Sequence, residues 1–198
     1  MGLSDSLSSF SMMINRWIQH PAGRFWMSVV VAIIATLPVV RGEAVGDLIH
    51  QYALLECFGR QFWQGEFYPR WCMNANAGYG SPIPIFYFPL PFLFSALFYP
   101  LFWFGVSIPL VFQSVVAALH VITCLAAFRW AAALGLRGGA ALILAALCVW
   151  SPYRTELVYV RSALAETCCL IFVLLLLAEC HHRHLCLKVW VCMTACIA

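Results

Sequence analysis

Apolar residues are gathered into runs that are too long for the core of a soluble domain, and polar stretches separate them. The first run occupies 25–40, and others follow at 83–104, 108–128, 138–153 and 162–178. Because a helix needs about 20 apolar residues to cross a bilayer, the runs predict transmembrane helices. We therefore expect an all-α integral membrane protein, built as a multi-helix transmembrane bundle.

A sixth apolar run begins at 187 and stops at 198, where the sequence ends. It is too short to cross a bilayer, which needs about 20 residues. The chain therefore resembles the N-terminal part of a longer membrane protein, and we do not expect such a fragment to be active alone.

The polar segment 41–82 lies between the first two runs and forms a long first loop. An apolar stripe at helical spacing predicts a helix over about 47–64 that lies at the membrane surface. The stripe consists of Leu48, Tyr52, Leu55, Phe58 and Phe62. The remainder of the segment is rich in Gly, Pro and Asn and is expected to be irregular.

Residues 1–24 are polar, carry Arg16 and Arg24, and predict a cytoplasmic leader. This orients the multi-pass chain with its N-terminus in the cytoplasm and the 41–82 loop outside. Strict alternation then puts 129–137 outside and 150–161 inside. Each of these loops carries two arginines, so charge does not choose between them, and a re-entrant fourth run would change the assignment.

The composition supports this class of protein. Hydrophobic residues make up 64% of the chain and charged residues 10%, and the mean hydropathy is +0.89. No Asp, Glu, Lys or Arg occurs between Trp71 and Phe128. The net charge of +3 forms no basic cluster. The lipid bilayer is therefore the expected partner, and nucleic acid is not.

Most of the ten cysteines lie inside apolar runs, where they behave as small hydrophobic residues. Cys57 and Cys72 share the polar loop and could either pair, if that loop is extracytoplasmic, or remain free thiols. Cys180, Cys186 and the histidines between them match no familiar zinc spacing. Basic residues at a helix end are the favoured interpretation of that segment.

Asp47 is the first candidate for chemistry, because it stands just beyond the first span. A carboxylate there could be a general base for a substrate hydroxyl, or hold a divalent metal ion as a cofactor. The alternative is that Asp47 simply caps the predicted helix. His50, one turn later, could be a second ligand or a proton carrier, or only a polar residue at the interface.

Arg70 and Tyr79 form the second candidate group, since Arg suits a phosphate and Tyr a sugar face. The alternative is an ordinary aromatic belt with a nearby cation. Arg161 and Glu166 form the third. On one continuous helix, five residues correspond to about 140°, so they are not expected to face each other, and each would need another partner. Glu166 is either functional within the membrane or hydrated at its surface.

Four sequence blocks, taken in order, carry a family resemblance: GDLIHQ, GEFYPRW, GYGSPIPIFYFPLP and SPYRTELVYVRSALAE. They resemble the N-terminal third of bacterial polytopic membrane proteins labelled "6-pyruvoyl-tetrahydropterin synthase-related". These proteins are similar to the YfhO type and, more distantly, to GT-C glycosyltransferases. The resemblance covers roughly 44–166, and Ser162 departs from the Gly that the last block leads us to expect.

The resemblance implies a multi-pass protein of the bacterial inner membrane, with a GT-C-like N-terminal portion and a long first external loop. It implies transfer of a sugar from a polyprenyl-phosphate donor at the outer face, with Asp47 as the base or metal-binding acid. Arg70, Tyr79 and Arg161 would then contact the donor. His50 and Glu166 complete the substrate-binding set that we expect.

Two non-enzymatic alternatives remain. The proline-rich run 83–104 and Glu166 also suit the substrate path of a transporter or flippase-like protein. A scaffold component would need Asp47 only as a helix cap.

Overall fold

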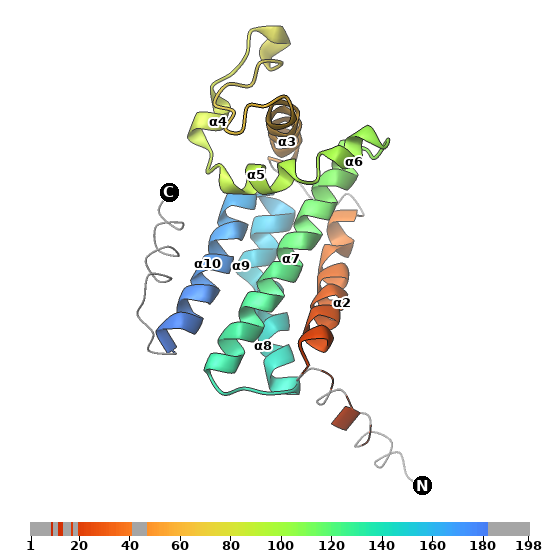
Figure 1. Ribbon diagram of the computed structural model, residues 1–198, viewed down its shortest axis with the longest axis vertical. Coiled ribbons are helices and arrows are strands. Elements are labelled where there is room, and N and C mark those ends of the chain that lie inside the picture. The colour runs from red at the N-terminus through yellow and green to blue at the C-terminus, as the bar shows by residue number, and fades with distance from the viewer. Residues whose placement is uncertain (1–8, 10–11, 14–16, 18–19, 41–46, 182–198) are drawn as a thin grey trace. The chain divides into compact units, whose positions relative to one another are not determined.

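The computed structural model describes residues 9, 12–13, 17, 20–40 and 47–181. These residues form helices and loops without a sheet, apart from one isolated antiparallel bridge between Cys72 and Ser81. The helices, labelled in Figure 1, are α2 (Pro21–Val40), α3 (Leu48–Trp63), α4 (Ile83–Phe86), α5 (Leu90–Ala96), α6 (Pro100–Trp103), α7 (Ile108–Ala133), α8 (Gly139–Val149), α9 (Pro152–Thr155) and α10 (Leu164–His181). A 3₁₀ turn occupies Asn76–Gly78 and a π-helical turn Glu156–Val160.

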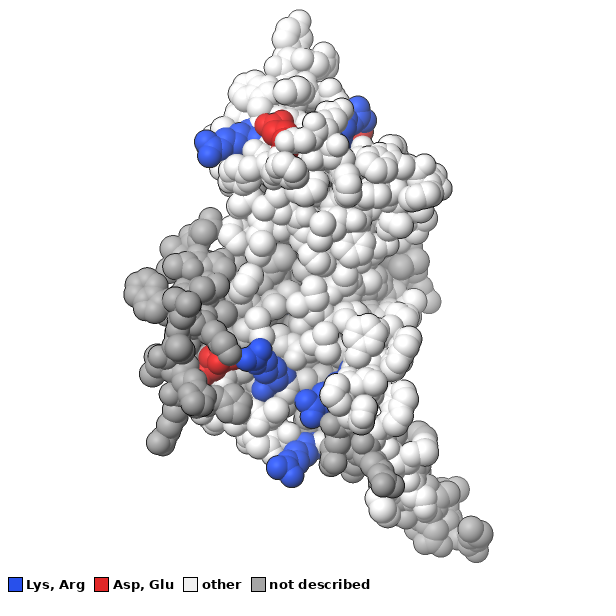
Figure 2. Space-filling model, viewed as in Figure 1, with Lys and Arg blue, Asp and Glu red and all other residues white. Residues whose placement is uncertain are grey.

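Two of these helices, α7 and α10, are long and apolar enough to cross a membrane. A third candidate span arises if α8 and the helical segment Pro152–Val160 are counted as one broken helix. The described residues therefore form an all-helical protein with two to three candidate membrane spans. Most of the face seen in Figure 2 carries no charge, as expected for a surface in contact with lipid.

Proline divides the apolar stretch 83–104 into three short helices. Pro84, Pro91 and Pro100 each lie in the first turn of α4, α5 or α6. Proline is tolerated there because the amide that it lacks would have no partner within the helix. No helix in this stretch is long enough to be a candidate span. The sixth predicted run, 187–198, lies outside the described residues.

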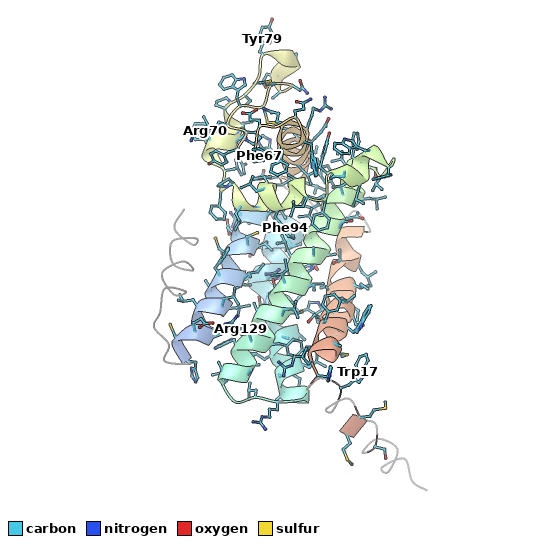
Figure 3. The ribbon with its side chains drawn as sticks, in the orientation of Figure 1. Trp17, Phe67, Arg70, Tyr79, Phe94 and Arg129 are labelled. Carbon is cyan, nitrogen blue, oxygen red and sulfur yellow. A yellow bond between two sulfur atoms is a disulfide. The ribbon has the colours of Figure 1, made fainter. Side chains whose placement is uncertain are left out.

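Contacts within the chain divide it into two compact units. Unit 1 comprises the described residues within 1–35, 120–151 and 170–181, and unit 2 comprises those within 36–119 and 152–169. In unit 1, Ala35, Cys124 and Val149 form a small apolar core on three different helices. An ion pair between Arg129 of α7 and Glu179 of α10 also lies in this unit (Figure 3).

In unit 2, α3 packs on α5 (Figure 1). The core consists of Leu54, Phe58, Cys72 and Phe92, and the rings of Phe58 and Phe92 stack with centroids 5.6 Å apart. The buried face of α3 includes two glutamines, Gln51 and Gln61, which fall outside the predicted apolar stripe. The helix therefore presents a more polar face to its neighbours than the stripe indicated.

The loop after α3 is tied back to that helix. Glycine ends the helix, because Gly65 has φ 101° and the Glu66 amide donates to the Gln61 carbonyl at 3.0 Å. A disulfide joins Cys57 of α3 to Cys72 of the loop. The Gln61 side chain donates to the Trp71 carbonyl oxygen at 2.8 Å. The pairing of Cys57 with Cys72, left open by the sequence, therefore anchors the loop on α3.

Gly59 gives a test of how closely α3 is packed. A Cβ atom at this position would overlap the ring of Tyr99. Alanine favours a helix over glycine by about 1 kcal/mol, but forcing a methyl group into a filled site costs about 1–3 kcal/mol. We expect Gly59→Ala to lower the Tm in detergent. In a Tyr99→Ala background, where the ring is gone, the same change should raise the Tm. A higher Tm in the unaltered background would contradict the close approach.

Candidate functional site

A cavity of about 230 Å³ in unit 2 brings together residues that are far apart in the sequence. We call it the Asp47 cavity. Its lining comprises Asp47, Gln51, Tyr87, Phe92, Arg161, Ala163, Leu164, Ala165 and Glu166. These residues come from the start of α3, the α4–α5 segment and the start of α10. Three of the six predicted site residues, Asp47, Arg161 and Glu166, therefore share one cavity.

Arg161 and Glu166 face each other across a break in the helix. Arg161 Nη2 donates to Glu166 Oε1 at 3.1 Å, and Nη1 donates to Oε2 at 3.3 Å. The expectation that they point apart was wrong, because it assumed one continuous helix. The π-helical turn ends at Val160 and Arg161 is its C-cap residue, while Ser162 has φ 53°, in the left-handed region. The left-handed conformation of Ser162 interrupts the helix, and a new helix, α10, begins at Leu164.

Glu166 lies in the first turn of α10 rather than deep within an apolar run. A carboxylate is stabilised there by the positive end of the helix dipole. Its side chain is partly exposed, and its Oε2 also accepts a hydrogen bond from the Tyr153 hydroxyl at 3.2 Å. These observations favour the interpretation of Glu166 as a polar group at a helix end, held in place by Arg161.

Asp47 occupies the N-cap position of α3, but its side chain makes no capping hydrogen bond. Its main-chain carbonyl instead accepts from the Gln51 amide at 2.9 Å. Asp47 is exposed and lines the cavity. The backbone therefore starts the helix without using the carboxylate, which leaves that group available for another role.

Gln51 is the residue that the sequence analysis missed. It is 3% exposed, lines the Asp47 cavity, and its buried Oε1 atom accepts no hydrogen bond. An unsatisfied buried polar atom costs about 1–3 kcal/mol, so it normally has a reason. One signal was available: Gln51 lies one turn after Asp47, and three and four residues before the buried Leu54 and Leu55.

The other three predicted residues lie elsewhere. His50 borders a second cavity of about 410 Å³ beside the disulfide, with its ring 6.2 Å from that of Tyr87. Arg70 lies over the Tyr68 ring, 5.3 Å from its centroid. Tyr79 is 89% exposed at the tip of the loop (Figure 3). Neither Arg70 nor Tyr79 lines the Asp47 cavity.

Arg60 adds a fixed positive charge to the second cavity. It lines that cavity with Glu56, to which it donates a hydrogen bond at 2.7 Å. A hydrogen bond with the Tyr99 side chain is the main cause that raises the pKa of Arg60 above its usual value, and Glu56 acts in the same direction. His50 therefore shares its cavity with the Arg60–Glu56 ion pair, whereas Asp47 shares its cavity with the Arg161–Glu166 pair.

No metal centre is evident among the described residues, since no three His, Cys, Asp or Glu side chains there are grouped to hold an ion. Of the Cys180–Cys186 segment, only Cys180 and His181 lie within the described part of the chain. The divalent ion expected at Asp47 stays a prediction.

Most of the polar groups that line the Asp47 cavity are hydrogen-bond acceptors. Asp47 and Glu166 contribute carboxylates and Gln51 contributes an amide oxygen without a donor. Tyr87 and Phe92 add aromatic surface. Carboxylates with aromatic faces suit a ligand that bears hydroxyl groups on an apolar ring.

No protein-family model, curated protein or solved structure matches the chain. The resemblance to GT-C glycosyltransferases therefore stays a prediction.

Two buried glutamines on α3 give a matched test of the cavity. Gln51 has an unsatisfied oxygen, whereas Gln61 donates to Trp71 and to Glu66. Replacing an unsatisfied group with an apolar one removes a penalty of about 1–3 kcal/mol. We expect Gln51→Leu to raise the Tm in detergent and Gln61→Leu to lower it. A fall in Tm for both variants would show that Gln51 is satisfied in the protein.

Proposed function

We propose that the chain belongs to a membrane-embedded glycosyltransferase of the GT-C type. It would transfer a sugar from a polyprenyl-phosphate donor to a hydroxyl acceptor at the outer face of the membrane. The observation that carries this proposal is the Asp47 cavity. An uncommitted carboxylate there adjoins a buried acceptor, Gln51, and an arginine, Arg161.

In the proposed reaction, the acceptor oxygen attacks the anomeric carbon of the donor sugar. The bond from that carbon to the phosphate oxygen breaks, and polyprenyl phosphate leaves with the electron pair. Asp47 takes the proton from the acceptor hydroxyl as general base. Arg161 pairs with Glu166, and its remaining N–H groups suit the departing phosphate.

Gln51 would act in binding rather than in proton transfer. Its unsatisfied Oε1 lacks a donor, and a sugar hydroxyl would supply one. Tyr87 and Phe92 would contact the apolar face of the ring. A ligand bound in this way removes the penalty of the buried oxygen, so binding free energy depends on the position of the hydroxyl.

The outer-face placement is supported by the disulfide. Disulfides persist in oxidising compartments and are rare in the bacterial cytosol. The Cys57–Cys72 bond fixes the loop to α3, the helix that begins at Asp47. The proposed chemistry is therefore assigned to the extracytoplasmic side.

A second candidate is a transporter or flippase-like protein, and the interrupted helix before α10 favours it. The π-helical turn Glu156–Val160 and the left-handed Ser162 break the backbone where Arg161 reaches the cavity. Broken helices beside polar residues are typical of substrate sites in transporters. Such a protein would move a lipid-linked sugar without cleaving it.

Asp47→Asn tests the enzymatic proposal. Loss of the base should lower transfer of radiolabelled sugar from a polyprenyl-phosphate hexose by about 10²–10⁴-fold, measured in membranes that contain the full-length protein. Glu56→Gln is the matched control, because Glu56 is another carboxylate on α3 that pairs with Arg60 outside this cavity. Undiminished transfer by Asp47→Asn would end the proposal, and movement of the intact donor without cleavage would favour the transporter.

Chemical labelling of intact spheroplasts tests the orientation. A membrane-impermeant maleimide–polyethylene glycol should gain adducts after reduction, because the Cys57–Cys72 disulfide then yields accessible thiols. The double variant Cys57→Ser, Cys72→Ser should lose these additional adducts and no others. If the adducts appear only after the cells are lysed, the loop is cytoplasmic.

A further inference from the structure

A second polar cavity, in unit 1, lies at the ends of helices and is not used by the proposed reaction. It has a volume of about 370 Å³. We call it the Arg24–Arg137 cavity. Its lining comprises Arg24, Phe128, Ala132, Gly135, Leu136, Arg137, Gly138 and Ala141. Among the described lining residues there are two guanidinium side chains and no carboxylate, whereas the Asp47 cavity has two carboxylates.

The turn between α7 and α8 builds one wall of this cavity. Gly135 has φ 77° and its amide donates to the Ala132 carbonyl at 3.1 Å, while the Leu136 amide donates to that of Ala131 at 2.9 Å. This paired arrangement is a Schellman motif, which ends a helix sharply. The next residue, Arg137, is thereby placed at the cavity, and α8 begins two residues later at Gly139.

Arg24 comes from a different part of the chain, the first turns of α2. It is partly buried, and the Ser28 hydroxyl donates to its carbonyl oxygen at 2.8 Å. Leu136 and Ala132, which are both exposed, supply apolar surface beside the two charges. The cavity therefore combines two cationic side chains with an apolar wall, an arrangement that suits an amphiphile with an anionic headgroup.

Sharing one cavity also places Arg24 and Arg137 on one side of the membrane. Strict alternation of the predicted spans had put Arg137 on the opposite side from Arg24. The common cavity instead requires an even number of crossings between them. The candidate span α7 supplies one crossing, and the predicted first run, 25–40, would supply the other if 83–104 does not cross. Arg24, Arg129 and Arg137 then all lie on the cytoplasmic side, in accord with the positive-inside rule.

We propose that the Arg24–Arg137 cavity binds the phosphate headgroup of an anionic phospholipid of the cytoplasmic leaflet. The two guanidinium groups neutralise the phosphodiester, and the acyl chains lie along the exposed Leu136 and Ala132. Basic pockets between membrane helices on this side are suited to such headgroups. The bound lipid joins the start of α2 to the α7–α8 turn and so stabilises unit 1.

Lipid-dependent stability of the purified full chain tests this site. The probes are dioleoyl phosphatidylglycerol, the zwitterionic dioleoyl phosphatidylcholine, and inorganic phosphate alone. Phosphatidylglycerol should raise the Tm in detergent in a saturable manner, whereas the other two should not. Arg24→Gln and Arg137→Gln should each weaken the apparent affinity about fivefold, as expected for one arginine at a lipid surface. Arg24→Lys and Arg137→Lys should retain most of it.

Arg70→Gln is the matched control, because it removes an exposed arginine that does not line the cavity. It should leave the phosphatidylglycerol response unchanged. An equal response to phosphatidylcholine, or equal weakening by Arg70→Gln, would overturn the proposal. An equal response to inorganic phosphate would show that the cavity binds a free anion and would overturn the proposal of a bound lipid. If a Gln variant fails to fold, the Lys variants and the probe comparison still decide the outcome.

Discussion

The satisfaction of main-chain hydrogen bonds is the constraint on which this structure depends. In an apolar environment an unpaired amide or carbonyl is costly, so an apolar chain forms helices that satisfy the groups internally. The exceptions occur at helix ends, where several groups lack partners within the helix. Both cavities that carry a proposal lie at such ends: one where α3 and α10 begin, the other at the α7–α8 turn.

Breaks in the helices thus concentrate the polar chemistry of a chain that has little charge. Each break has a local backbone cause: the left-handed Ser162 precedes α10, Gly135 ends α7, and Gly65 ends α3. The polar side chains at the two cavities differ in character. The Asp47 cavity is rich in acceptors, whereas the Arg24–Arg137 cavity is cationic. The two sites therefore suit different proposed ligands, a lipid-linked sugar at the Asp47 cavity and a phospholipid headgroup at the Arg24–Arg137 cavity.

Packing of α3 gives the acceptor-rich cavity a firm boundary, because the lining residue Gln51 lies on the buried face of this helix. The Cys57–Cys72 disulfide and the hydrogen bond from Gln61 to Trp71 hold the irregular segment against α3. Stacking of Phe58 on Phe92 holds α3 against α5. The position of Asp47 is thus set by a packed helix rather than by a loose loop, which favours precise placement of a reacting group.

The sequence by itself determined the helical class, the location of the long apolar helices and the position of α3, because these depend on local composition and periodicity. It also identified Asp47, Arg161 and Glu166 as candidates. Only the tertiary structure decided that these three share a cavity and that Arg161 pairs with Glu166. The reason is that one left-handed residue redirects the chain, and helical spacing does not reveal it. Burial of Gln51 and the meeting of Arg24 with Arg137 likewise depend on packing between distant segments, which no local pattern encodes.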